Sequence, residues 1–151
     1  MQFRHSGKLC FEDPIGNRFR WGRFDSWNAG NTGIFLLHDL QQLRGLVGTF
    51  AEVALDLVEY SSDQVIFHSP PGGFLWGKTN SEGLITFALI KSPYWYRLLY
   101  DLREIVYMQW DEGAEQGEGE WIPAVQDFPL PAAGGRAIEI HADGRVKIRN
   151  A

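Results

Sequence analysis

Residues 137–149, Ala-Ile-Glu-Ile-His-Ala-Asp-Gly-Arg-Val-Lys-Ile-Arg, carry the clearest folding signal in the chain. Apolar and polar residues alternate on both sides of Ala142-Asp143-Gly144, and this pattern predicts a C-terminal β-hairpin with a tight turn. The outward charges are glutamate on the first strand and arginine or lysine on the second, which favours pairing of the two strands.

A second alternating stretch lies near the start of the sequence. Residues 3–11 and 17–24 alternate aromatic with polar side chains, and the turn formers of residues 13–17 separate them. They predict an N-terminal hairpin. The short apolar run at residues 34–37 predicts a buried strand.

The middle of the sequence holds three more β-prone runs, at residues 64–68, 74–77 and 84–90. Pro70-Pro71-Gly72-Gly73 and the polar residues 79–83 separate them, and both are strong turn sequences. We therefore expect a central antiparallel meander.

One amphipathic helix is predicted to begin after Asp39, a preferred N-cap residue. Apolar side chains recur from there every three or four positions as far as Leu57. Val53, Leu55 and Leu57 also alternate as a strand would, so residues 52–58 are either helix or strand on this criterion.

A second helix is predicted from Ser92-Pro93, an N-cap residue followed by a first-turn proline. Its apolar spacing continues to about Met108.

Strands that flank two separate helices, without regular alternation of strand and helix, are typical of an α+β fold. We expect a largely antiparallel sheet packed with two amphipathic helices; the alternative is a parallel doubly wound sheet. Residues 1–151 have the size of one globular domain. The charged side chains among residues 111–120 are all acidic and the rest are small or polar, so this stretch predicts a mobile acidic loop.

The net charge of −5 is unevenly distributed. Residues 101–127 carry eight acidic side chains and one basic side chain, a charge of −7. Nucleic-acid binding is not expected of such a chain, because phosphate neutralisation by Lys and Arg supplies most of that affinity. Cys10 is the single cysteine and no apolar run approaches the roughly 18 residues of a membrane span, so we expect a cytoplasmic protein without membrane contact.

Residues 72–79 fit the phosphate-binding template G-x-x-x-x-G-K-[ST]. That template must follow a strand and open a helix, whereas residues 80–83 predict a turn where the helix should begin. The alternative hypothesis is a small nucleotide- or ligand-binding protein or enzyme that uses this loop. Its ligand-binding residues would be His68, Gly72, Gly77, Lys78 and Thr79.

The four histidines lack the spacing of a metal site, so no metal and no cofactor is expected. His38 beside Asp39 and His68 before Pro70 are candidates for acid–base chemistry, although packing and capping are commoner roles. No catalytic residue is assigned, and enzymatic activity is not expected.

Aromatic residues make up 14% of the chain and crowd residues 94–110 more densely than one apolar helix stripe requires. Aromatic side chains anchor protein interfaces, and the neighbouring acidic charge would steer a basic partner. The leading hypothesis is a non-catalytic protein-binding module, such as an inhibitor or immunity-type factor, that engages a basic protein. A self-associating structural or assembly subunit is a further alternative. The predicted partner-binding residues are Tyr96, Tyr100, Tyr107, Trp110, Asp111, Glu112, Glu115, Glu118 and Glu120.

Overall fold

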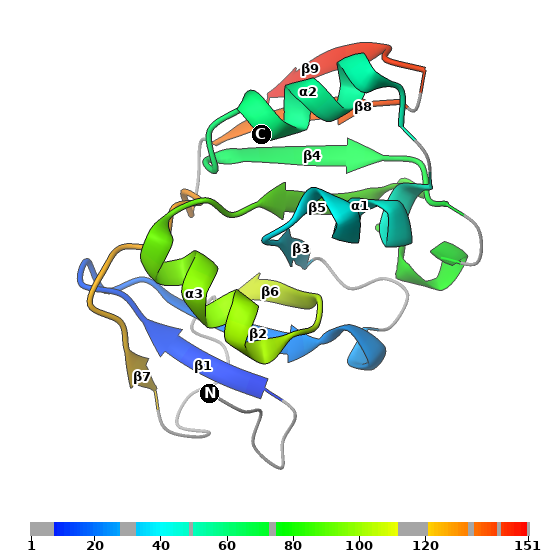
Figure 1. Ribbon diagram of the computed structural model, residues 1–151. Helices are drawn as coiled ribbons and strands as arrows, with labels where there is room; N and C mark the ends of the chain where they lie inside the picture. Colours follow the sequence, from blue (N-terminus) through cyan, green and yellow to red (C-terminus); the bar gives the residue numbers. More distant parts are fainter. Residues whose placement is uncertain are drawn as a thin grey trace.

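The computed structural model describes residues 8–27, 33–48, 50–72, 75–111, 121–132, 135–141 and 143–150. Within these residues, nine strands form one sheet, accompanied by three α-helices and two 3-10 helices (Figure 1). The strands are β1 (Lys8–Glu12), β2 (Arg18–Arg23), β3 (Ile34–Leu37), β4 (Val65–Ser69), β5 (Ile85–Leu89), β6 (Val106–Trp110), β7 (Ile122–Pro123), β8 (Arg136–Ile140) and β9 (Val146–Asn150). The helices are α1 (Leu40–Val47), α2 (Glu52–Tyr60) and α3 (Pro93–Leu102), with the 3-10 helices η1 (Phe24–Ser26) and η2 (Leu75–Lys78). The predicted α+β class is confirmed.

The sheet is mixed, so the expectation of a largely antiparallel sheet is wrong. Its strand order is β7-β1-β2-β6-β3-β5-β4-β8-β9. The pairs β1–β7, β3–β5 and β4–β8 are parallel, and the remaining pairs are antiparallel. Alternation of residue types predicts where strands lie but not which strands become neighbours. After β3 the chain passes through α1 and α2 and returns to the sheet as β4. The next strand, β5, runs antiparallel to β4 and therefore lies parallel to β3.

Gly48 divides the first predicted helix in two. Asp39 is the N-cap of α1: its side chain accepts a hydrogen bond from Gln41 N at 2.8 Å, and Gln42 Oε1 accepts one from Asp39 N at 3.2 Å. The helix ends at Val47, because the next residue, Gly48, has a φ of 77°, which is not helical. The chain then forms α2, so the stretch that the sequence left open between helix and strand is helical.

Two further elements differ from the prediction. The helix α3 ends at Leu102 rather than near Met108, because Arg103 adopts a left-handed conformation with φ of 57°. The next residues form β6, between β2 and β3. A strand that is covered on both faces is mostly apolar, and a short apolar run also fits helical spacing. This ambiguity explains why the residues of β6 were predicted as part of the helix. The strand predicted at residues 74–77 is wrong as well, because this part of the connection between β4 and β5 contains η2.

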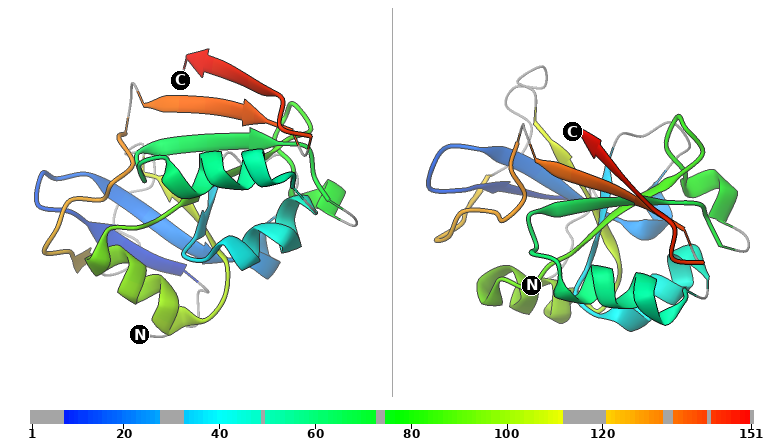
Figure 2. Two further views of the ribbon diagram at one scale, coloured as in Figure 1. Left: turned by 45° about the horizontal axis from the view of Figure 1, so that its top comes forward. Right: turned by 90° about the horizontal axis from the view of Figure 1, so that it is seen from above.

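The hydrophobic residues pack in two clusters, on opposite faces of the sheet. Ile34 and Leu36 of β3 belong to the cluster with α3, whereas Phe35 and Leu37 belong to the cluster with α1 and α2. Figure 1 shows α3 near β1, β2 and β6, and α2 near β4 and β8. Each strand is rotated by about 20 to 25° relative to its neighbour. Across the nine described strands of the sheet, this twist makes opposite faces point in a similar direction at the two ends. All three helices therefore lie toward the same side of the molecule in the view from above (Figure 2).

Aromatic side chains form the centre of the α3 cluster. Trp95 is fully buried, and its Nε1 donates a hydrogen bond to the Asp127 carbonyl at 2.9 Å. Four further rings have centroids between 5.0 and 5.7 Å from the Trp95 ring: Phe11, Phe19, Trp21 and Phe128. Core packing therefore accounts for much of the aromatic content.

Candidate functional site

The outer side of α3 presents two tyrosines one helical turn apart. Tyr96 is 40% exposed and Tyr100 is 56% exposed. Their rings stack with centroids 6.3 Å apart and planes inclined by 18°. The inner side of the helix is buried through Trp95, Leu99 and Leu102. Packing against the core therefore fixes the position of the helix that carries the two tyrosines.

His38 follows β3 and contacts both tyrosines, with ring centroids 5.6 Å and 5.7 Å from theirs. Its Nδ1 is buried without a hydrogen-bond partner among the described residues, and burial lowers the pKa of the imidazole below its ordinary value. The ring is therefore neutral at pH 7. Asp39 caps α1 instead of binding His38, so no imidazole–carboxylate pair forms here. We call His38, Tyr96 and Tyr100 the aromatic surface.

Three of the other residues predicted to bind a partner, Tyr107, Trp110 and Asp111, lie apart from this surface. Tyr107 is 3% exposed and packs edge-on against Trp27, and burial raises the pKa of its phenol. Trp110 packs against the α3 cluster. Asp111 forms an ion pair with Arg20 at 3.3 Å. The remaining four lie outside the described residues: Glu112, Glu115, Glu118 and Glu120.

Arg20 contacts both residues that flank the acidic segment, residues 112–120. Its Nη1 pairs with Asp111, and its guanidinium lies 5.3 Å from the ring centroid of Trp121. Arg18 lies 4.9 Å from the same ring. Asp111 and Trp121 therefore lie close together, on the face of β2 opposite the side chains that pack with α3. Sequence reasoning missed this arrangement, although the alternation of basic and aromatic residues in the N-terminal hairpin was its signal.

The ammonium group of Lys78, in the phosphate-loop pattern, makes contacts within the protein. Its Nζ donates to the carbonyl oxygens of Phe24 at 2.8 Å and Trp27 at 3.2 Å, and lies 4.8 Å from the Phe24 ring centroid. Gly77 and Thr79 flank it in a connection that turns into β5 rather than into a helix. The helix N-terminus that would bind a phosphate is therefore not formed at this loop.

Gly72, the first glycine of the pattern, packs closely against the end of α1. Its N–H donates to the Leu46 carbonyl at 2.9 Å. A Cβ at this position would lie 2.4 Å from Gly48 N, whereas a Cβ at Gly77 would meet nothing within 4 Å. Gly72 is thus required by chain packing.

His68 lies on β4, between β5 and β8. Its Nδ1 is 3.0 Å from Thr86 Oγ1. Burial, and then the positive charge of Arg149, lower the pKa of the imidazole. These contacts favour a neutral packing residue.

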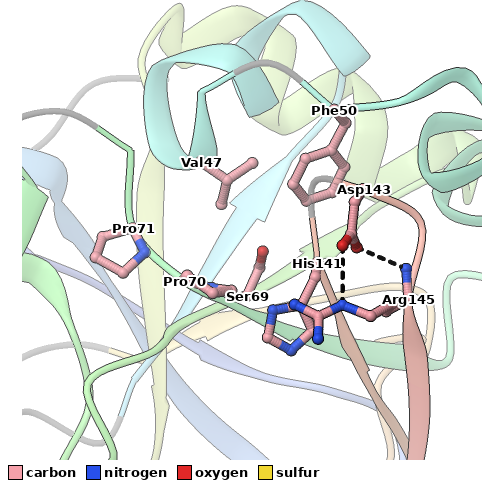
Figure 3. Close-up of a pocket in the computed structure, with 8 residues that line it drawn as sticks. All are labelled: Val47, Phe50, Ser69, Pro70, Pro71, His141, Asp143 and Arg145. Carbon is pink, nitrogen blue, oxygen red and sulfur yellow. Dashed lines mark hydrogen bonds and ion pairs between the residues drawn. The ribbon is translucent and has the colours of Figure 1, made fainter.

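A pocket of about 330 Å³ lies where the end of α1, the end of β4 and the β8–β9 turn meet (Figure 3). Its apolar lining residues are Val47, Phe50, Pro70 and Pro71. Its polar lining residues are Ser69, His141, Asp143 and Arg145. The described lining includes none of the five predicted ligand-binding residues, although Ser69 directly follows His68. Sequence reasoning missed this site.

Hydrogen bonds organise the polar side of the pocket. Asp143 accepts two hydrogen bonds from Arg145, from its backbone N at 3.0 Å and from its Nε at 2.9 Å. The backbone bond is the main cause of the lowered pKa of Asp143. The Nε2 of His141 lies 3.0 Å from Glu139 Oε2, and this hydrogen bond lowers the pKa of Glu139. Ser69 Oγ has no partner among the described residues, so no serine–histidine hydrogen bond of a nucleophilic site is present.

The described ranges contain no cluster of three His, Cys, Asp or Glu side chains suited to holding a metal ion. In the same ranges, no helix combines the length and apolarity needed to cross a bilayer. Comparisons with protein-family models, curated proteins and solved structures found no significant match.

Proposed function

We propose that this chain is a non-catalytic protein-binding module that uses the aromatic surface as the centre of its contact with a partner. The observation that carries the proposal is the exposed, stacked pair Tyr96 and Tyr100 on a helix whose inner side is buried. Tyrosine offers a large contact area and a hydroxyl group at low entropic cost, which explains its enrichment at interfaces. The neutral ring of His38 adds contact area without the cost of burying a charge.

The charge of the chain supports a basic partner. Residues 101–127 carry −7, and the residues that flank the acidic segment, Asp111 and Trp121, contact Arg20 on the face of β2 turned away from α3. We assign to this charge a long-range effect, the electrostatic field that speeds association. Residues in direct contact mainly set the dissociation rate. The two parts of the proposal thus predict different kinetic effects.

The test compares the proteins captured by three forms of the chain from cells that naturally make it. The forms are the parent, the double variant Tyr96→Ala/Tyr100→Ala, and the control Tyr60→Ala, which removes a tyrosine that is 80% exposed on α2. We expect one protein to be retained by the parent and the control but lost by the double variant. If the double variant retains every protein that the parent retains, the aromatic surface is not the binding site.

Binding kinetics with the purified partner test the role of charge. We expect the double tyrosine variant to raise the dissociation rate by about tenfold or more, as for an interface hot spot. Charge reversal of Glu115, Glu118 and Glu120 to lysine should lower the association rate at low salt and leave the dissociation rate nearly unchanged. An unchanged association rate would exclude electrostatic attraction to a basic partner. Sedimentation at several concentrations distinguishes this module from a self-associating subunit.

A further inference from the structure

The pocket between α1, β4 and the β8–β9 turn contains a buried hydroxyl group without a partner. Ser69 is 0% exposed, and its Oγ has no hydrogen-bond partner among the described residues. Figure 3 shows this oxygen directed toward the space between Val47 and Phe50. Buried polar groups in folded proteins are nearly always bonded. A polar atom of a bound molecule would complete the contacts of Ser69.

The groups at the mouth of the pocket determine the charge of that molecule. Both oxygens of Asp143 already accept hydrogen bonds from Arg145, and Glu139 is engaged with His141. The Nη atoms of Arg145 make no hydrogen bond within the described part of the chain, and its side chain is 76% exposed. Each of these carboxylates is thus already paired with a neighbouring donor, whereas the Nη donors of Arg145 have no partner in that part of the chain. A ligand group that accepts hydrogen bonds would complement them. A carboxylate matches the planar guanidinium best.

The inner wall of the pocket requires an apolar body between these two polar ends. Val47, Phe50, Pro70 and Pro71 line it. The volume of about 330 Å³ lies at the small end of the range for ligand pockets, and it suits one aromatic ring or a branched chain.

We propose that this pocket binds a small carboxylic acid with an apolar body and a hydroxyl or carbonyl oxygen at its far end. The carboxylate accepts hydrogen bonds from the Nη atoms of Arg145, the body contacts Phe50 and the two prolines, and the far oxygen bonds Ser69 Oγ. A free acid and the C-terminal residue of a peptide share this chemistry. The site is separate from the aromatic surface and does not depend on its function.

The test measures dissociation constants by NMR titration with three matched probes. 4-Hydroxyphenylacetate carries both polar groups, phenylacetate lacks the hydroxyl, and 2-(4-hydroxyphenyl)ethanol lacks the carboxylate. We expect the first to bind best. Omission of the hydroxyl should weaken binding by about fivefold, the effect of one hydrogen bond, and omission of the carboxylate by about tenfold or more, because its hydrogen bonds are charge-assisted. The tripeptide glycyl-glycyl-tyrosine, with a free carboxylate, distinguishes the two sources: tighter binding than the free acid indicates a peptide terminus, and weaker binding indicates a free acid.

Two variants connect these preferences to their residues. Ser69→Ala should make phenylacetate and 4-hydroxyphenylacetate bind with equal affinity. Arg145→Gln should make 4-hydroxyphenylacetate and 2-(4-hydroxyphenyl)ethanol bind with equal affinity. Arg97→Gln, which changes an exposed arginine of α3, is the control and should alter neither preference. Both pocket variants are expected to fold, because one removes an unbonded hydroxyl and the other changes an exposed side chain. No saturable binding of any probe to the parent, or preferences that neither pocket variant changes, would overturn the proposal.

Discussion

Replacing Lys78 with methionine removes an ammonium group that joins two distant parts of the chain but keeps most of the apolar side chain. The ammonium donates to the carbonyls of Phe24 and Trp27 and lies over the Phe24 ring. Because the side chain is only half-buried, and because Phe24 O also accepts from Trp27 N, we assign about 1 kcal/mol to the two hydrogen bonds together and about 0.5 to 1 kcal/mol to the ring contact. Lys78→Met should therefore lower the free energy of unfolding by about 1.5 to 2 kcal/mol.

Urea unfolding followed by tryptophan fluorescence measures this loss, and a decrease of about 3 to 8 °C in Tm should accompany it in a chain of this size. The control is Lys147→Met, which removes an exposed ammonium on β9 and should change stability by less than about 0.5 kcal/mol. An unfolding curve unchanged by Lys78→Met would refute the structural role. If Mg-ATP stabilised the parent but not this variant, the phosphate-loop hypothesis would be restored.

Two other predictions concern glycine packing and pH. Gly72→Ala should lose about 1 to 3 kcal/mol of stability, because the added Cβ meets the backbone of Gly48. Gly77→Ala should be neutral, because nothing lies near its Cβ. Thermal unfolding of the two variants distinguishes chain packing, which requires only Gly72, from a phosphate site that needs both glycines. The pKa of His68 is lowered in the folded chain from an ordinary value of 6.5, so the unfolded chain binds more protons between the folded pKa and 6.5, and stability falls as the pH falls through that window. His68→Gln should reduce this decline, measured as the difference between urea midpoints at pH 7.5 and pH 5.5, and an undiminished decline would exclude His68 as a cause.

Local residue patterns predicted individual elements better than their arrangement. The alternation of residues 137–149 located β8 and β9, which pair with Ile138 opposite Ile148, and Asp39 located the start of α1. These features depend on residues close together in the chain. The position of β6 depends instead on burial between β2 and β3. Its apolar residues continue the spacing of α3. The left-handed Arg103 ends the helix, and only residues 103–105 separate the two elements.

The candidate sites depend even more on tertiary structure. Tyr100 and Tyr107 have similar sequence surroundings, yet the first is exposed on a helix and the second is buried on a strand. The pocket combines Val47 from α1, Ser69 from β4 and Arg145 from the β8–β9 turn. No spacing rule relates residues so far apart in the sequence, so no local pattern could have predicted the pocket.

The central position of β6 has a consequence for how the chain folds during synthesis. β2 and β3 are made early, but both are neighbours of β6, which emerges from the ribosome much later. Until then β2 has only β1 beside it, and the two halves of the sheet have no strand to join them. A nascent chain in this state presents unpaired strand edges and uncovered aromatic side chains, the surfaces that chaperones bind and that lead to aggregation. Completion of the sheet is thus delayed until the last third of the chain has been translated.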